Sequence, residues 1–422
     1  MKLARIALLL TTMALSAFSS VAADTEVKVS GELRFRNEFD ARSFNPDAVM
    51  KNYQLLRTRL AVEALVDSNT HAFVQFQDSR TAGGYTSTGE LQSGLLNDGK
   101  NVDLHQAFIQ IDRLGYEGIG ARLGRFEFNL GGQRVFGSVG WHNVGRSWEG
   151  VQGWYDNDDF KFSAFWLRHA ENNDVEFNRD YDLIGLHTRL ERANTELFGV
   201  YEIDSDTLDV MAPAVQDYEK NKLNRMSIGL YSLQKKNRFD LELNAVFQTG
   251  TQSDTIDIQA YMFAVEAGFT LPIDAKARLA LGIDYATGDD DPADTEYKTY
   301  NNLYYTGHKF RGHMDYFIGS GDYGLIDMYF RSSLVPMADW LIKLDAHYFT
   351  TAQEYLVLPT VSSSDVGIEF DFSVSTVAVA GVNLSSGVSV FSPHVNYVET
   401  MGSVGDSDDF TYWIYNQAVV TF

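Results

Sequence analysis

Arginine residues stand two positions apart at two places near the start of the chain, Arg34 with Arg36 and Arg57 with Arg59. Residues two apart in an extended chain project to the same side, so each pair would present two guanidinium groups to one face of a strand. A guanidinium group stays charged in confined sites and binds a carboxylate through two parallel hydrogen bonds. We therefore expect these four residues to contact a carboxylate-bearing, anionic cargo.

Further basic residues occupy polar positions later in the chain. This expected cargo-lining set also includes Arg80, Arg125, Arg331 and Lys343. Acidic residues such as Glu242 and Asp345 are interleaved with them and would make each binding step shallow enough for release. For any single arginine a structural ion pair is the alternative interpretation, so the functional hypothesis rests on the array as a whole.

The residue types and spacings do not indicate catalysis. The chain has no Cys, which excludes thiol catalysis and zinc–thiolate sites. The histidines occur at no metal-ligand spacing, and no Ser lies beside a His as nucleophile and base. We expect no enzymatic activity, no cofactor and no metal, with an outer-membrane barrel hydrolase as the enzymatic alternative. The acidic run 289–296 could offer oxygen ligands to Ca²⁺, but we interpret it as a solvated loop.

The composition and the first residues indicate an exported protein. In 422 residues, 34 Lys and Arg face 57 Asp and Glu, and a net charge of −23 argues against nucleic acid as a partner. Lys2 and Arg5 precede an apolar run, and Val21-Ala22-Ala23 forms a small-residue cleavage site. This order is typical of a secretory signal peptide, which we predict over residues 1–23. Residues 24–422 would then form the mature protein, as a single domain.

The mature chain alternates between apolar and polar residues throughout. In 238–248, for example, Leu241, Leu243 and Phe247 alternate with Glu242 and Asn244. A period of two predicts strands with two different faces. Eighteen such strands are predicted, at 28–40, 52–67, 70–81, 101–112, 118–129, 146–157, 159–169, 180–191, 195–204, 222–235, 238–250, 256–271, 275–288, 322–335, 338–351, 365–381, 387–399 and 409–422.

The connections between the predicted strands alternate between long and short. Long polar connections follow odd-numbered strands, at 82–100, 130–145, 205–221, 289–321 and 352–364. Short ones follow even-numbered strands, at 68–69, 158, 236–237, 336–337 and 384–386. Outer-membrane barrels have an even strand number, short periplasmic turns and long extracellular loops. The sequence therefore predicts an all-β fold, a transmembrane antiparallel β-barrel of about 18 strands with an aqueous lumen.

The last predicted strand is aromatic and ends in phenylalanine. Phe410, Tyr412, Ile414 and Val420 share one face with the terminal Phe422. A C-terminal segment of this kind resembles the signal by which the barrel assembly machinery recognises its substrates. We therefore expect that machinery as a partner, through Phe422.

Specific motifs resemble the alginate export family of outer-membrane barrels. They are FQDSR at 76–80, LHQAFIQID at 104–112, RLGRFEFNLGGQRVFG at 122–137, WHNVGRSWEG at 141–150 and HKFRGHMD at 308–315. The resemblance implies an electropositive constriction through which a uronate polysaccharide leaves the cell. Carried over by these motifs, Arg125, Glu127 and Arg134 would lie at or near an external loop and the constriction. Lys309 and Asp315 would belong to the later loop motif. We therefore also expect Glu127, Arg134 and Lys309 to line the lumen and contact cargo.

These observations together predict a channel of the outer membrane. It would export or pass an alginate-like uronate polymer through an arginine-lined lumen. The alternative is a diffusion porin for small anions, sugars or organic acids. We expect a monomer that contacts outer-membrane lipid and works with periplasmic secretion proteins.

Overall fold

The computed structural model describes residues 26–82, 102–170, 180–204, 223–253, 255–403 and 406–422. The predicted signal peptide, most of the 82–100 connection and the whole 205–221 connection lie outside these ranges. The strands are β1 (Glu26–Ala41), β2 (Lys51–Asp67), β3 (Thr70–Thr81), β4 (Asp103–Ile111), β5 (Ile119–Phe126), β6 (Trp148–Asp156), β7 (Phe160–Ala170), β8 (Tyr181–Leu190), β9 (Thr195–Asp204), β10 (Leu223–Lys236), β11 (Phe239–Thr251), β12 (Asp257–Thr270), β13 (Arg278–Ala286), β14 (Glu296–Tyr297), β15 (Leu325–Leu334), β16 (Trp340–Leu358), β17 (Val361–Val379), β18 (Val382–Pro393) and β19 (Thr411–Thr421).

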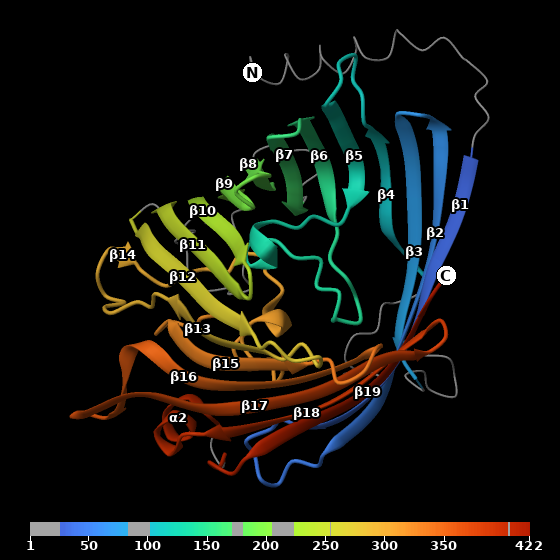
Figure 1. Cartoon of the computed structure of the whole chain (residues 1–422). Helices are drawn as coiled ribbons and strands as arrows, with labels where there is room; N and C mark the ends of the chain where they lie inside the picture. The colour runs from blue at the N-terminus through green and yellow to red at the C-terminus, as the bar shows by residue number, and fades with distance from the viewer. Residues whose placement is uncertain (1–25, 83–101, 171–179, 205–222, 254, 404–405) are drawn as a thin grey trace, which may run out of the picture.

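Eighteen of these strands form a closed antiparallel barrel, as predicted. Each strand pairs with its neighbours in the sequence, and β1 closes the ring by pairing with β19 (Figure 1). The two-residue β14 lies outside this ring and pairs with the start of β12. Closure of the ring gives the backbone groups of every edge strand a hydrogen-bond partner. A sheet that spans a membrane requires this because hydrocarbon offers no hydrogen-bond partners.

The two faces of the barrel differ as the alternation requires. Large apolar side chains such as Leu60, Leu281 and Phe370 are exposed on the outside. Charged side chains such as Arg34 and Asp284 are buried inside. This arrangement is the reverse of a soluble sandwich and fits a wall between lipid and an interior filled by polar groups. No described helix is long and apolar enough to cross a membrane.

Three boundary predictions near the C-terminus were wrong. The predicted loop 352–364 is instead an extension of the hairpin, because β16 and β17 stay paired to Leu358 and Val361. The next turn lies at 380–381 rather than 384–386, since Gly381 supplies the positive φ (75°) that a tight turn needs. The predicted strand 387–399 ends at Pro393, and the helix α2 (Val395–Met401) begins after the capping residue His394.

The seam where β1 pairs with β19 and closes the barrel can be tested by substitution. Gly31 exchanges both backbone hydrogen bonds with Phe422, at 2.8 and 3.1 Å. A Cβ at position 31 would lie 2.5 Å from the Phe422 ring and 2.9 Å from the carbonyl oxygen of Arg59. Gly31→Ala should therefore destabilise the folded barrel by about 1–3 kcal/mol. The measurement is the temperature at which heating converts the folded barrel to the unfolded form on a gel (heat modification), and this temperature should fall. The control is Gly199→Ala, where nothing lies within 4 Å of the added Cβ; equal shifts for the two variants would contradict the account.

Candidate pore constriction

Two long connections fold into the space that the strands enclose (Figure 1). The first, residues 127–147, joins β5 to β6 and contains the short helix η1 (Gly131–Gln133). Gly131 and Gly132 both have φ of 62°, which lets the chain reverse direction inside the barrel. The turn rests on the far wall, where Asn244 of β11 donates a hydrogen bond to the Gly131 carbonyl (2.9 Å). We call residues 127–147 the first inserted segment.

The second inserted segment, residues 287–324, joins β13 to β15 and contains η2 (Gly307–Lys309). It pairs with the first segment through backbone hydrogen bonds, from Gly137 N to Tyr304 O (2.9 Å), from Tyr304 N to Val135 O (3.0 Å) and from Thr306 N to Gln133 O (3.0 Å). These bonds satisfy backbone groups that would otherwise be unpaired away from the strand ladders. The two segments therefore behave as one structural unit.

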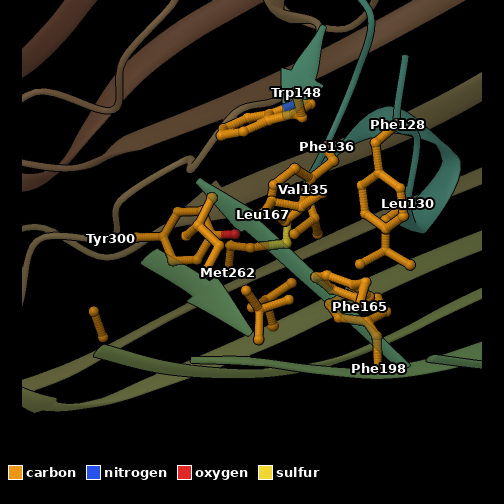
Figure 2. Packing of buried hydrophobic residues seen from close by; sticks show 14 of the residues in the cluster. Phe128, Leu130, Val135, Phe136, Trp148, Phe165, Leu167, Phe198, Met262 and Tyr300 are labelled. Atoms are coloured by element: carbon orange, nitrogen blue, oxygen red, sulfur yellow. The ribbon is translucent and has the colours of Figure 1, made fainter. Parts of the chain in front are cut away.

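An aromatic cluster joins this unit to one side of the barrel wall. Figure 2 shows Phe128 and Phe136 of the first segment packed with Trp148, Phe165 and Tyr300. The Phe136 ring contacts Trp148 at 5.5 Å and Tyr304 at 5.3 Å between centroids. Such a cluster combines apolar burial with favourable edge contacts between rings. It lies inside the barrel, a region that would otherwise be filled by water or cargo.

The basic wall of β1 and β2 binds the tip of the first segment. Arg34 donates hydrogen bonds to the carbonyl oxygens of Gly140 (3.0 Å), Trp141 (3.1 Å) and His142 (3.0 Å). Arg57 donates to Gly140 and His142, both at 2.9 Å, and Arg36 donates to Trp141 at 2.8 Å. The structure thus places these three predicted cargo residues as buried anchors of a loop.

The acidic wall of β13 and β17 binds both segments. Asp284 accepts hydrogen bonds from Arg134 of the first segment and Arg311 of the second. On β17, Glu369 accepts from the Met314 backbone N–H (2.8 Å) and Asp371 from that of His313 (3.2 Å). Arg134 is therefore also an anchor rather than a free lumen cation.

Gly312 permits this contact. It has φ of 74°, and a Cβ there would lie only 2.3–2.6 Å from the Glu369 carboxylate. The backbone can therefore approach the acid closely only because this residue has no side chain.

A stack of planar groups connects the basic and acidic walls. The Arg36 guanidinium lies 4.3 Å from the centre of the Trp141 ring. On Trp141, the His308 ring stacks at 4.5 Å and 7°, and His313 follows at 4.8 Å and 17°. His308 also hydrogen-bonds Asp315 (3.0 Å), so the loop motif HKFRGHMD forms the centre of this stack.

The remaining predicted residues have different environments. Arg59 donates a hydrogen bond to the side chain of Gln77 (2.7 Å) and forms an ion pair with Glu127 (3.3 Å). Glu127 also contacts the ring of His105 at 2.8 Å. Burial alone would raise the pKa of Glu127, but the hydrogen bond from His105 and the charge of Arg59 hold it below its ordinary value.

Three other basic residues belong to the interior or the second segment. Arg331 pairs with Glu266 (2.9 Å) and donates to the carbonyl oxygen of Phe310 (2.6 Å). Lys309 donates to the carbonyl oxygen of Gly132 (3.0 Å), and Lys343 is exposed.

The prediction that Arg80 lines the lumen was wrong. In the β2–β3 ladder Arg80 lies opposite Leu56, on the same side as the outward-facing pair Leu60 and Phe76. Directly opposed residues in an antiparallel ladder share a face, so Arg80 points outward and pairs there with Asp78. The error arose because a polar residue was assumed to face the lumen, whereas the outer face also turns polar toward the end of this strand.

A cavity of about 470 Å³ lies between the two segments. Its lining includes Arg125 on β5, Trp141 and Arg146 of the first segment, and Tyr305 and Asp315 of the second. Arg125 pairs with Glu149, and Arg146 donates to the carbonyl oxygens of Gly137 and Tyr304. Of the basic residues expected to contact cargo, Arg125 borders this cavity at the end of β5. In the β5–β6 ladder, however, it lies opposite Glu149 and on the same side as the exposed Leu123 and Val151, so the prediction that it lines the lumen was wrong for the same reason as for Arg80.

Comparison with known proteins identifies the chain. The family model described as alginate export matches residues 25–406, nearly the whole length. The chain belongs to the alginate export family. It is an outer-membrane-type barrel channel, in agreement with the prediction. No curated protein matches it.

Solved structures share the fold at low identity. OccK8 (OprE) of Pseudomonas aeruginosa is 12% identical with a TM-score of 0.57, over 94% of this chain and 98% of that one. A BenF-like porin from Pseudomonas fluorescens Pf-5 is 11% identical with a TM-score of 0.58, over 94% and 98%. Pseudomonas aeruginosa OccK2 (OpdF), solved in complex with glucuronate, is 11% identical with a TM-score of 0.54, over 94% and 97%.

The acidic run 289–296 of this alginate export family member surrounds a lysine. The Lys298 ammonium lies 2.6 Å from Asp290, 3.4 Å from Asp294 and 3.5 Å from Glu296. Among the described residues, no group of three or more acidic, His or Cys side chains could hold a metal ion. The interpretation as a solvated loop fits this local charge balance.

Sequence reasoning missed several residues of the constriction. His105 faces inward because it is the extra residue of a bulge in the β3–β4 pairing, between Gln106 and Leu104. Trp141 and His142 were noted only as part of a motif, although their carbonyls receive the arginine bonds. Neither the bulge nor the carbonyl contacts have a local sequence signal.

The anchoring role of the arginines can be tested by channel recording. Arg34→Gln removes the charged donor of four hydrogen bonds to the first segment, each worth about 1.5–3 kcal/mol. We expect the tip of the segment to detach, which raises single-channel conductance and current noise. The matched control is Arg80→Gln, which changes an arginine on the outer face. A wild-type conductance for Arg34→Gln would show that Arg34 does not hold the segment.

The second segment should respond to acid. Burial lowers the pKa of His313 to about 4, against the charges of Asp371 and Asp315, with His308 and His347 also facing it. Because this pKa is depressed, docking is at full strength above about pH 6.5 and weakens as pH falls toward 4. Heat-modification temperatures should fall over this window in the wild type and fall less in His313→Gln. Superimposable profiles would contradict the assignment.

Proposed function

We propose that this channel passes uronates, with an alginate-like uronate polymer as its cargo. The observation that carries the proposal is the positive charge of the basic wall. Arg34 directs its guanidinium group at three backbone carbonyls and the side-chain oxygen of Asn143, which use its donors but do not cancel its charge. A wall whose donors are occupied can still attract anions without binding them tightly.

The arrangement of charges within the barrel favours the attraction of anions. Arg36, Arg57 and Arg59 each have one carboxylate partner, Glu38, Glu32 and Glu127, whereas Arg34 bonds only neutral oxygens among the described residues. The basic wall therefore carries an uncompensated positive charge beside the first segment. Fixed charge of one sign in a narrow, low-dielectric passage concentrates solutes of the opposite sign.

The paired inserted segments favour a second candidate function, the uptake or release of small carboxylated solutes. They join across the interior through backbone bonds and narrow the space left for a polymer. The glucuronate complex of the similarly folded OccK2 concerns a single sugar acid. Both candidates require recognition of a carboxylate, and they differ in the length of chain that can pass.

The remaining expectations complete the proposal. Residues 1–23 would be removed on export, and the mature protein would reside in the outer membrane as a monomer. The barrel assembly machinery would recognise the segment that ends in Phe422, whose backbone closes the ring at Gly31. Periplasmic secretion proteins would supply the polymer.

Planar-bilayer recording of the purified mature channel tests the proposal. We expect a reversal potential that indicates anion preference, and concentration-dependent block by oligouronates that grows stronger with chain length. Neutral oligosaccharides of equal length serve as the control and should block weakly. Block by glucuronate but not by oligouronates would select the small-solute alternative. Cation preference with indifference to all uronates would overturn both.

A further inference from the structure

A basic turn joins β10 to β11. It runs through Lys235, Lys236, Asn237 and Arg238, all of them exposed, in a chain whose net charge is −23. Asn237 has φ of 58°, which Asn adopts more readily than most residues, and the chain reverses there between the paired Lys236 and Phe239. Short connections face the periplasm in outer-membrane barrels, so this turn lies at the periplasmic edge of the wall.

Lys236 lies on the outer face of the barrel. It is directly opposite Phe239 of β11, which is opposite Phe269 of β12, which in turn is opposite Leu279 of β13. Directly opposed residues share a face of the sheet, and Phe239 is 64% exposed on the outside. One row across four neighbouring strands (Figure 1) therefore begins with an ammonium group and continues with apolar side chains.

The apolar part of this row marks the edge of the hydrocarbon. The rings of Phe239 and Phe269 are 4.7 Å apart between centroids, and the exposed Leu241 follows on the same face of β11. Aromatic side chains of outer-membrane barrels gather where hydrocarbon meets the lipid headgroups. The cations of the turn therefore lie just beyond the apolar band, at the level of the lipid phosphates.

The cations on the outer side of the turn are free to bind an external anion. Within the described ranges, neither Lys236 nor Arg238 forms an ion pair with a carboxylate. Asp240, the nearest acid along the chain, lies opposite Lys235 on the inner face and accepts a hydrogen bond from Arg278 (3.0 Å). Uncompensated basic residues beside a lipid surface attract anionic headgroups.

We propose that the β10–β11 turn binds an anionic phospholipid of the periplasmic leaflet, with Lys236 and Arg238 on its phosphate and Phe239 and Phe269 against its acyl chains. A phospholipid carries its phosphate directly beside its hydrocarbon, and this surface places cations directly beside an apolar belt. A uronate chain has no hydrocarbon part and would leave that belt unused. The inference goes beyond the proposed function and takes from it only the location in the outer membrane.

The test measures lipid retention by native mass spectrometry of the purified channel in detergent. The probes are phosphatidylglycerol, which is anionic, and phosphatidylcholine, which is zwitterionic. The wild type should retain phosphatidylglycerol preferentially, and the double variant Lys236→Gln, Arg238→Gln should weaken this retention about tenfold or more while leaving phosphatidylcholine unchanged. The double variant Lys236→Arg, Arg238→Lys keeps both charges and should retain the lipid as the wild type does.

The matched control removes two other cations near the periplasmic edge. Lys161 pairs with Asp156 (3.4 Å) and Arg192 with Asp159 (2.7 Å), so Lys161→Gln, Arg192→Gln changes the net charge equally without touching the turn. This variant should behave as the wild type. Inorganic phosphate in excess, which lacks hydrocarbon, should not displace the lipid.

The outcomes separate the lipid site from its rivals. Equal retention of the two lipids, or no loss in Lys236→Gln, Arg238→Gln, would overturn the proposal. Equal loss in the control variant would overturn it as well, because the effect would then be one of net charge. Displacement of the lipid by oligouronates would assign the turn to cargo instead. A channel that passes no uronate but retains phosphatidylglycerol through these residues would overturn the proposed function and leave the lipid site standing.

Discussion

The hydrogen bonds from buried arginines to backbone carbonyls are the interaction on which the rest of the constriction depends. A long loop can enter a barrel only if its backbone groups find partners there, since each unpaired group costs about as much as a lost hydrogen bond. Arg34, Arg36 and Arg57 meet this requirement at residues 140–142. The guanidinium group suits the task because its donors spread in one plane and can serve adjacent carbonyls together.

The acidic wall provides hydrogen-bond acceptors for donor groups of the second segment. Carboxylates of Asp284, Glu369 and Asp371 accept from arginines and from backbone N–H groups. The two walls thus differ in sign because one binds acceptors and the other binds donors. Under the proposed function, the same charges would create the field that an anionic cargo meets, so anchoring of the segments and selectivity of the channel would have a common physical origin.

The fold could be predicted from the sequence to a large extent, and the constriction only in part. A period of two is imposed by lipid on one side and polar groups on the other, so all eighteen barrel strands were identified, with errors only at some boundaries. The hairpin extension to Leu358 and Val361 was missed because its two sides are an apolar run at 355–358 and a polar run at 362–365, neither of which alternates. The inward folding of 127–147 and 287–324 depends on contacts between distant residues, such as Gly137 with Tyr304, and these leave no local pattern. For the same reason the arginines were recognised as a group while the partners of Arg34 and the outward direction of Arg80 were not.

The central claim is that the two inserted segments are one docked unit that sets the width of the passage. A Cβ built on Gly137 would lie 3.0 Å from Cβ and 3.1 Å from the backbone nitrogen of Thr306, so a side chain at position 137 would force the two segments apart, whereas nothing lies within 4 Å of a Cβ built on Gly140. The most direct measurement is therefore the single-channel conductance of Gly137→Val, with Gly140→Val of the same segment as the matched control. The account predicts that Gly137→Val raises the conductance and the current noise, because the segments separate, and that Gly140→Val leaves both at the wild-type level. A wild-type conductance for Gly137→Val, or an equal rise for the two variants, would contradict it.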